Sequence, residues 1–252
     1  MDLGIEGKVA LVAGASKGLG RAVALGLARE GVSLALCARG EEQLSEAATA
    51  IAEETGATVW TRPTDVSSPE ETRLFVQEAV SHYDTVHILV NNAGGPPSAT
   101  FLELTDDLWQ QAVQLNLLSA IWLARAAVPH MQKVHWGRII NMTSVAVKQP
   151  IEGLMLSNAV RAGVVGFAKT LANELAADNI LVNNVCPGYI LTDRVRELSK
   201  VLAEKRNESP ESIIRTWEES IPLRRLGEVE EFANLVVFLA SERASYITGN
   251  SI

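Results

Sequence analysis

The chain is poor in the residues and segments that mark secreted, metal-binding or disulfide-linked proteins. Its 252 residues include only two cysteines, Cys37 and Cys186, and both stand in apolar runs without a metal-ligating neighbour. Such cysteines are usually inert buried thiols, so we expect neither a disulfide nor a metal site. Residues 1–8 contain no basic segment followed by an apolar one, so no signal peptide is predicted and a cytoplasmic location is expected.

Basic charge and long apolar runs are also scarce. Lys and Arg number 22 against 30 Asp and Glu, which gives a formal net charge of -8. An acidic surface repels nucleic acid and anionic membranes, so neither is an expected partner. No apolar run approaches the ~18 residues that a membrane helix needs. The 47% of hydrophobic residues instead fits a soluble globular protein with a substantial core.

What the chain does have is a regular alternation of short β-branched runs and longer helical patterns. This alternation predicts a doubly wound α/β fold, in which a parallel sheet carries helices on both faces. Near-continuous apolar strands agree, because a parallel sheet is buried on both sides. The expected strands are 9–13, 32–38, 58–61, 86–91, 138–142 and 180–186, and the expected helices are 19–30, 41–55, 69–83, 106–132 and 156–177.

No linker or internal repeat divides the chain, so residues 1–252 are predicted to form a single domain. Residues 192–220 interrupt the alternation with two short charged helices around Pro210. In a doubly wound fold, an insertion after a late strand lies over the carboxyl edge of the sheet, so this segment is a candidate substrate lid. The alternation would place a seventh strand after Gly249, but residues 250–252 show no strand pattern, so no seventh strand is predicted.

A glycine-rich stretch separates the first expected strand from the first expected helix. Glycines at this position let the backbone approach a pyrophosphate, and the N-terminus of the helix stabilises its negative charge. The flanking strand and helix distinguish such a site from a structural turn. The sequence therefore predicts a Rossmann-type dinucleotide-binding fold. Its cofactor-binding residues in this stretch are Gly14, Ser16, Lys17, Gly18, Leu19 and Gly20.

The charges near this stretch indicate which dinucleotide is bound. An NAD site places an acid at the end of the second strand, where it hydrogen-bonds the ribose 2′-hydroxyl. Here that position is Arg39, and no acid follows before Glu41. Lys17 faces the same ribose, and an arginine can meet a 2′-phosphate with two hydrogen bonds. We therefore predict NADP(H) as the cofactor, with two solvated surface charges as the alternative interpretation.

Further motifs follow in a fixed order along the chain. They are Asp65-Val66 after the third expected strand, Asn91-Asn92-Ala93-Gly94 after the fourth, Ser144 after the fifth, and Pro187-Gly188 with Ile190 and Thr192 after the sixth. With the glycine spacing, this order resembles the short-chain dehydrogenases/reductases over essentially the whole chain, and it looks closest to the 3-oxoacyl-carrier-protein reductase-like branch. The resemblance implies an oxidoreductase that transfers a hydride between a nicotinamide and a carbonyl compound.

The resemblance also implies roles for individual residues. Ser144 corresponds to the catalytic serine of the family, and Asn116, in the long helix, corresponds to its active-site asparagine. A helix cap and a buried hydrogen-bonding residue are the alternative interpretations of these two positions. Further cofactor contacts are implied for Asp65, Val66, Asn92 and Ile190.

The chain departs from the family pattern at the catalytic tyrosine and lysine. The family places the tyrosine thirteen residues after the serine and the lysine four residues further on, and these positions hold Ser157 and Arg161 here. A serine hydroxyl is shorter and far less acidic than a phenol, and an arginine cannot give up its proton. Arg161 can still hydrogen-bond the cofactor ribose, and an ordered water among Ser144, Ser157 and Arg161 is one candidate proton source. Tyr189 is another candidate acid, although a wall of the substrate pocket is the favoured interpretation.

Three functions are compatible with this altered site. The first is NADP(H)-dependent reduction of a ketone or 3-oxoacyl-like small molecule, with water or a substrate group supplying the proton. The second is a catalytically weak or inactive NADP(H)-binding pseudoenzyme or partner subunit. The third is other chemistry, such as that of a lyase or an imine reductase. We favour the first, because Ser144, Asn116 and the cofactor motifs are retained. A homo-oligomer, dimer or tetramer, is also expected, because the helices at 106–132 and 156–177 are apolar on more than one face.

Overall fold

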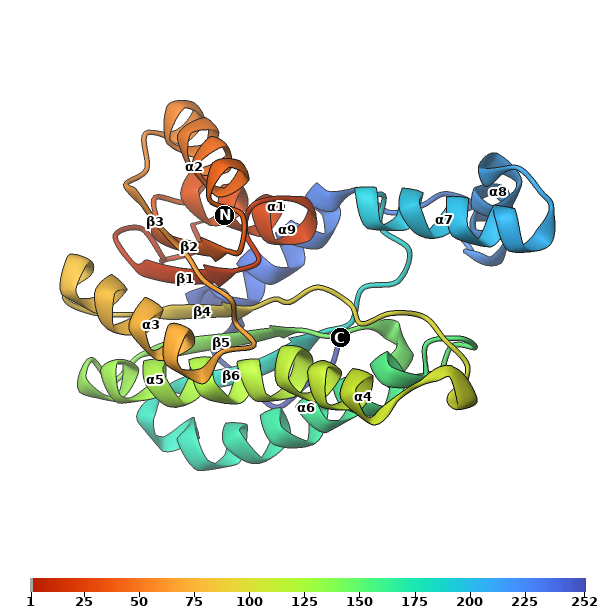
Figure 1. Cartoon of the computed structure of the whole chain (residues 1–252). Helices are drawn as coiled ribbons and strands as arrows, with labels where there is room; N and C mark the ends of the chain where they lie inside the picture. Colours follow the sequence, from red (N-terminus) through yellow and green to blue (C-terminus); the bar gives the residue numbers. More distant parts are fainter. Residues whose placement is uncertain (1) are drawn as a thin grey trace.

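A computed structural model of the chain describes residues 2–252, apart from the side chain at position 205, and contains a six-stranded parallel sheet (Figure 1). The strands lie in the order β3-β2-β1-β4-β5-β6, so the chain winds outward from β1 in both directions. The predicted Rossmann-type doubly wound fold is therefore confirmed. The strands are β1 (Val9–Ala13), β2 (Ser33–Ala38), β3 (Val59–Pro63), β4 (Ile88–Asn91), β5 (Gly137–Met142) and β6 (Ile180–Val185).

Helices cover both faces of the sheet, as predicted (Figure 1). Successive strand residues point to opposite faces, so the sheet has an apolar layer on each side. Val12 of β1 packs with α1 and α9, whereas Leu11 packs with α3 and α5. The helices of the first face are α1 (Gly18–Arg29), α2 (Glu41–Thr55) and α9 (Val229–Leu239), and those of the second are α3 (Pro69–Tyr83), α5 (Ser119–Lys133) and α6 (Met155–Leu175).

Two helical regions differ from the sequence prediction. The stretch expected at 106–132 consists of α4 (Asp106–Val113), the π-helical turn η2 (Gln114–Leu118) and α5. Such a turn often occurs at a functional site, and here it carries Asn116. The helix α9 is absent from the predicted elements, although its buried apolar residues recur at helical spacing. The short 3₁₀ turns are η1 (Phe101–Glu103), η3 (Val145–Val147), η4 (Ala176–Asp178) and η5 (Glu242–Ala244).

Residues 192–220 form two helices, α7 (Asp193–Arg206) and α8 (Pro210–Ser220), that project from the carboxyl edge of the sheet (Figure 1). Pro210 occupies the first turn of α8, where its missing amide hydrogen costs no hydrogen bond. The two helices share an apolar cluster that includes Ile213 and Trp217. Trp217 stacks on Tyr189 with ring centroids 4.8 Å apart, so the segment after β6 is packed against α8.

The expectation that no seventh strand is present needs correction, because residues 249–252 pair with the edge of β6. The amide of Gly249 donates to the carbonyl of Val182 at 2.7 Å, and the amide of Ile252 donates to that of Asn184 at 3.0 Å. These residues run parallel to β6 along its outer edge. The sequence does not reveal this pairing, because four residues are too few to show a strand pattern.

One continuous helical stretch in the described part of the chain, Asp106–Lys133, is long and apolar enough to cross a membrane by length and composition alone. The expectation that no such stretch exists is wrong by this measure. In the fold, Leu123 and Ala127 of this stretch pack against the sheet and α3. The core helix of a globular domain has the same composition, and this packing accounts for the apolar character of the buried side.

The two cysteines differ in burial. Cys37 lies inside β2, and burial raises the pKa of its thiol to about 12, so it is unreactive at neutral pH. Cys186 is only partly buried, and its Sγ lies 3.2 Å from the hydroxyl of Thr143. The expectation of two buried thiols is therefore correct for Cys37 alone.

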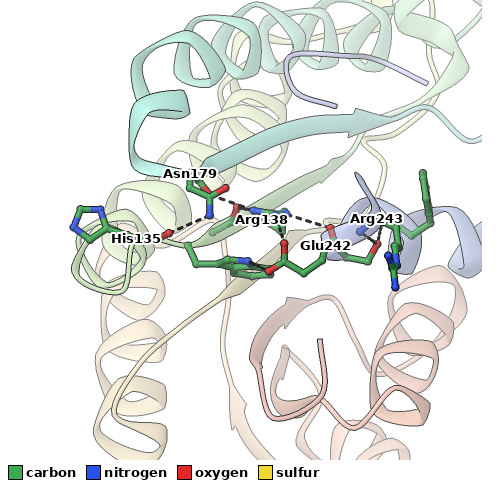
Figure 2. A network of polar contacts seen from close by, with 9 residues as sticks. His135, Arg138, Asn179, Glu242 and Arg243 are labelled. Atoms are coloured by element: carbon green, nitrogen blue, oxygen red, sulfur yellow. Dashed lines mark hydrogen bonds and ion pairs between the residues drawn. The ribbon is translucent and has the colours of Figure 1, made fainter. Parts of the chain in front are cut away.

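A polar network centred on Arg138 lies at the amino-terminal edge of the sheet (Figure 2). Arg138 is fully buried, and its Nη1 donates to the carbonyls of Gly137 at 2.8 Å and Asn179 at 3.2 Å. Its Nη2 lies 3.5 Å from Oε2 of Glu242, and the other carboxylate oxygen, Oε1, accepts a hydrogen bond from the indole of Trp136. Burial lowers the pKa of Arg138, and the Glu242 charge opposes this shift. The network joins β5, the start of β6 and η5.

We predict that Glu242→Ala lowers the free energy of unfolding by about 1–3 kcal/mol, because it leaves a buried guanidinium without its counter-charge. The side chain of Glu242 is 44% exposed, which keeps the loss below that of a fully buried pair. Chemical denaturation measures the effect. Glu54→Ala is the matched control, since its partner Arg29 is 54% exposed, and it should cost less than about 1 kcal/mol. Equal losses in the two variants would contradict the importance of burial.

Candidate active site

The loops that follow β1, β4 and β6 meet at the carboxyl edge of the sheet (Figure 1). The Asn92 side chain donates to the carbonyl of Gly14 at 3.1 Å, which joins the loop after β4 to the glycine stretch. A Cβ atom built on Gly18 would lie 3.9 Å from the methyl group of Thr192, so the segment after β6 passes beside the same stretch. Residues far apart in the sequence are thus brought together at this edge of the sheet.

The glycine stretch forms the turn between β1 and α1, as predicted. Gly14 and Gly18 have φ angles of 61° and 58°, in the left-handed region that favours glycine. A Cβ atom at Gly20 would lie 2.2 Å from the carbonyl oxygen of Gly14, so no larger residue fits there. Lys17 stands directly before α1, and its side chain is exposed. This turn leaves the first amides of α1 at this edge, where they can bind an anion.

Two cations and one acid flank this turn. The amide of Ala15 donates to the carbonyl of Cys37 at 3.1 Å, which places the end of β2, and Arg39 after it, beside the turn. Arg39 is exposed and, like Lys17, has no side-chain hydrogen bond or ion pair within residues 2–252. Asp65, after β3, accepts hydrogen bonds from the hydroxyl and amide of Ser67. Burial raises the pKa of Asp65, but these hydrogen bonds and the Arg39 charge outweigh it and lower the pKa.

Ser144 directly follows β5 at the same edge. Its Oγ accepts a hydrogen bond from the amide of Ala146 at 3.1 Å, which leaves the hydroxyl hydrogen free to donate. The next amide, of Val145, donates to the carbonyl of Pro187 at 3.0 Å and fixes the serine against the segment after β6. Ser157 lies in the first turn of α6 and is only 8% exposed. Among the described contacts, no hydrogen bond joins the two serines.

Arg161 is buried, and its guanidinium is directed at main-chain carbonyls. Nη1 donates to Met142 at 2.9 Å and to Thr143 at 3.1 Å, and Nη2 donates to Ala93 at 3.4 Å. Burial lowers the pKa of Arg161 to about 10, so the side chain still carries its charge at neutral pH. The guanidinium therefore joins the ends of β4 and β5. No acidic side chain pairs with it in the part of the chain that the structure describes.

A cavity of about 20 Å³ lies between Arg161, Asn91 and Asn116. The amide nitrogen of Asn116 donates to the carbonyl of Gly94 at 2.8 Å. Within residues 2–252 as described, Oδ1 of Asn116 has no hydrogen-bond partner, and neither has Oδ1 of Asn91. A cavity of this size, with several polar groups in its wall, can hold one water molecule. The sequence analysis predicts an ordered water among Ser144, Ser157 and Arg161. This cavity is instead lined by Arg161 and asparagines, and neither serine contributes to its wall.

Known proteins are similar to this chain in sequence and in fold. A family model described as enoyl-(acyl carrier protein) reductase matches residues 14–252. The 3-oxoacyl-[acyl-carrier-protein] reductase of Aquifex aeolicus is 36% identical to this chain, over 100% of the chain and 97% of that protein. The chain belongs to the short-chain dehydrogenase/reductase family.

Solved structures of this short-chain dehydrogenase/reductase type superpose closely. L-sorbose reductase from Gluconobacter frateurii, complexed with NADPH and L-sorbose, has a TM-score of 0.96 at 38% identity, and the match covers 100% of this chain and 96% of that one. A variant of actinorhodin polyketide ketoreductase with NADPH has a TM-score of 0.93 at 33% identity, over 97% of this chain and 94% of that one.

The remaining candidate residues of this family member line the same edge. Val66 and Asn92 contribute to the wall of the small cavity, and Ile190 pairs with Gly227. Burial raises the pKa of Tyr189, and its ring is stacked on Trp217. A phenol with a raised pKa is a weaker acid, so the geometry favours Tyr189 as a wall of the pocket.

Three asparagines that the sequence does not single out as site residues connect the strand ends. The Asn91 amide donates to Oδ1 of Asn141 at 2.8 Å, and the Asn141 amide donates to Oδ1 of Asn184 at 3.1 Å. The Asn184 amide donates in turn to the Ser251 hydroxyl at 3.0 Å. The three asparagines are partners in the strand register of β4, β5 and β6. Their shared position near the ends of three strands is the signal that could have identified them.

Arg161→Ala is predicted to destabilise the protein by about 2–4 kcal/mol, because it opens a cavity and removes the donor to three buried carbonyls. Thermal and chemical unfolding measure the loss. Arg125→Ala, which removes an exposed arginine from α5, serves as the control and should change stability by less than about 0.5 kcal/mol. A stable Arg161→Ala protein would show that the guanidinium is not needed to join β4 and β5.

Proposed function

We propose that the protein is an NADP(H)-dependent reductase of ketone or 3-oxoacyl-like carbonyl compounds, with a serine and an arginine where its family has a tyrosine and a lysine. The main support is the convergence of the glycine turn, Ser144 and Asn116 at one edge of the sheet. Its relatives support the same chemistry, since they include an L-sorbose reductase, a polyketide ketoreductase and a 3-oxoacyl-[acyl-carrier-protein] reductase.

The residues present fit an NADP(H) molecule. We place the pyrophosphate against the glycine turn, which a Cβ atom at Gly20 would fill. Ser16, Leu19 and the amides at the start of α1 complete this part of the site. Lys17 and Arg39 supply uncommitted positive charge for the 2′-phosphate. We assign Asp65 and Val66 to the adenine end, and Asn92, Ile190 and Arg161 to the ribose and nicotinamide end. When bound, the cofactor supplies a hydride.

The side chains of the site then complete a carbonyl reduction. The hydroxyl of Ser144, whose hydrogen is not used elsewhere, donates a hydrogen bond to the carbonyl oxygen without giving up its proton, and Ser157 supplies a second hydroxyl from α6. The buried charge of Arg161 stabilises the negative charge that develops on this oxygen. Asn116 fixes the loop at Gly94. Because none of these groups is a strong acid, we assign the proton that reaches the oxygen to water or to a substrate group.

We extend the proposal to the organisation of the protein. The domain is single, α7 and α8 serve as a lid over the substrate, and the protein is a cytoplasmic homo-oligomer. Only 39% of the most apolar window of Asp106–Lys133 is buried within one chain, which leaves apolar surface for a second copy.

The first prediction of this proposal concerns the cofactor. NADPH should bind more tightly than NADH. Arg39→Asp should lower the ratio of NADPH affinity to NADH affinity by about 10–100-fold, because it replaces a cation beside the 2′-phosphate with an acid. Fluorescence titration with both nucleotides measures the two affinities. Arg73→Asp makes the same charge change on α3, away from the glycine turn, and should leave the preference intact. Equal affinities in the unmodified protein would rule out the assignment.

The second prediction concerns the altered residues. Ser157→Tyr combined with Arg161→Lys should abolish the native activity, because Ser157 is buried and a ring there fills space that we assign to substrate or water. NADPH oxidation with a series of ketones and 3-oxo compounds measures the effect, with each single change as a control. A rise in ketone reduction of about 10²–10⁴ would instead identify a decayed site that lacks its general acid. Tight NADPH binding without any turnover would favour a pseudoenzyme.

A further inference from the structure

Arg194, in the first turn of α7, lies beside the loop that follows β4, at the edge of the sheet that carries the candidate active site. Its Nη2 lies 3.8 Å from the position that a Cβ atom on Gly95 would occupy. Gly95 follows Gly94, whose carbonyl accepts the hydrogen bond from Asn116. The guanidinium thus brings the helical insertion close to the loop after β4, next to the residue that Asn116 contacts.

The charge of Arg194 is not committed to another group of the protein. Within the described residues, its side chain has no hydrogen bond or ion pair, whereas Arg138 and Arg225 each pair with a glutamate. The buried cation of the site, Arg161, already donates to three carbonyls. Of these two groups, the guanidinium of Arg194 is therefore the one that remains available for the anionic group of a ligand at this edge.

The position of Arg194 is set by a well-anchored helix start. The Thr192 hydroxyl accepts from the amide of Val195 at 3.4 Å and caps α7. Two residues earlier, Ile190 pairs with Gly227. Asp193 in the first turn of α7 complements the helix dipole, whereas the cation of Arg194 in the same turn opposes it. An anion bound at Arg194 would offset the second effect.

We propose that Arg194 binds a carboxylate of the substrate, so that the carbonyl compounds reduced by this protein are oxo acids. A guanidinium matches a carboxylate with two parallel hydrogen bonds. The inference rests on the reductase function proposed above, in which Ser144 binds the ketone oxygen of the same molecule. Arg194 then selects the charged end of the substrate and Ser144 its reacting end.

Binding of two matched pairs tests this subsite: acetoacetate with methyl acetoacetate, and 3-oxohexanoate with its methyl ester. Titration calorimetry on the NADP⁺-bound protein measures binding, and NADPH oxidation measures turnover. We expect the acids to bind about tenfold more tightly than the esters, and Arg194→Gln to remove this difference. Arg196→Gln, an equal charge change two residues along the same helix, should preserve it. Arg194→Lys should restore part of the affinity, because it keeps the charge without the paired geometry.

The outcomes separate this inference from the proposed function. Acids that bind no better than esters, or whose binding is unchanged in Arg194→Gln, would overturn the carboxylate subsite. A loss of NADPH affinity in Arg194→Gln with acid binding unchanged would assign the arginine to a cofactor phosphate and would also overturn it. Arg194-dependent acid binding without turnover of any pair would uphold the subsite and count against the reductase. Reduction of the esters alone would support the reductase and contradict the subsite.

Discussion

The carbonyls of Ala93, Met142 and Thr143 converge on one guanidinium, that of Arg161, at the carboxyl ends of β4 and β5. Strand ends in a parallel sheet leave carbonyls that the sheet itself does not bond, and a buried carbonyl without a donor is costly. Arg161 supplies donors from α6 to both strands at once. The positions of Ser144, which follows Thr143, and of the loop after Ala93 depend on this contact.

This arrangement changes how the charge at position 161 can be used. An arginine presents a rigid set of donors, and three carbonyls occupy part of that set here. Burial lowers its pKa only to about 10, so the group stays positively charged and cannot pass a proton at neutral pH. Asn116 and Asn91, whose Oδ1 atoms have no hydrogen-bond partner among the described residues, line the same small cavity. Arg161 is thus a fixed positive charge at neutral pH, which agrees with the proposal that the proton comes from water or substrate.

The sequence predicts the elements whose pattern is local and misses those that depend on distant partners. Glu41–Thr55 and Pro69–Tyr83 begin and end where predicted, because helical periodicity and start signals such as Pro69 lie within each segment. The pairing of residues 249–252 with β6 is missed, because β6 supplies its hydrogen-bond partners. For the same reason, the sequence identifies Arg161 from its spacing to Ser144 but does not reveal the three carbonyls to which it donates.

The distribution of charge follows from the same geometry. The chain has a formal net charge of -8, so its surface as a whole repels anions. Lys17 and Arg39 beside the glycine turn, and Arg194 beside Gly95, oppose that field at one edge of the sheet. Anions that approach this edge are therefore attracted by these exposed cations. Because these cations are exposed, salt screens them over about 8–10 Å at physiological ionic strength, whereas the buried charge of Arg161 is screened much less. Anion binding at these exposed cations should weaken as salt is added. The field that Arg161 exerts on the carbonyl group in the proposed reaction should stay nearly constant.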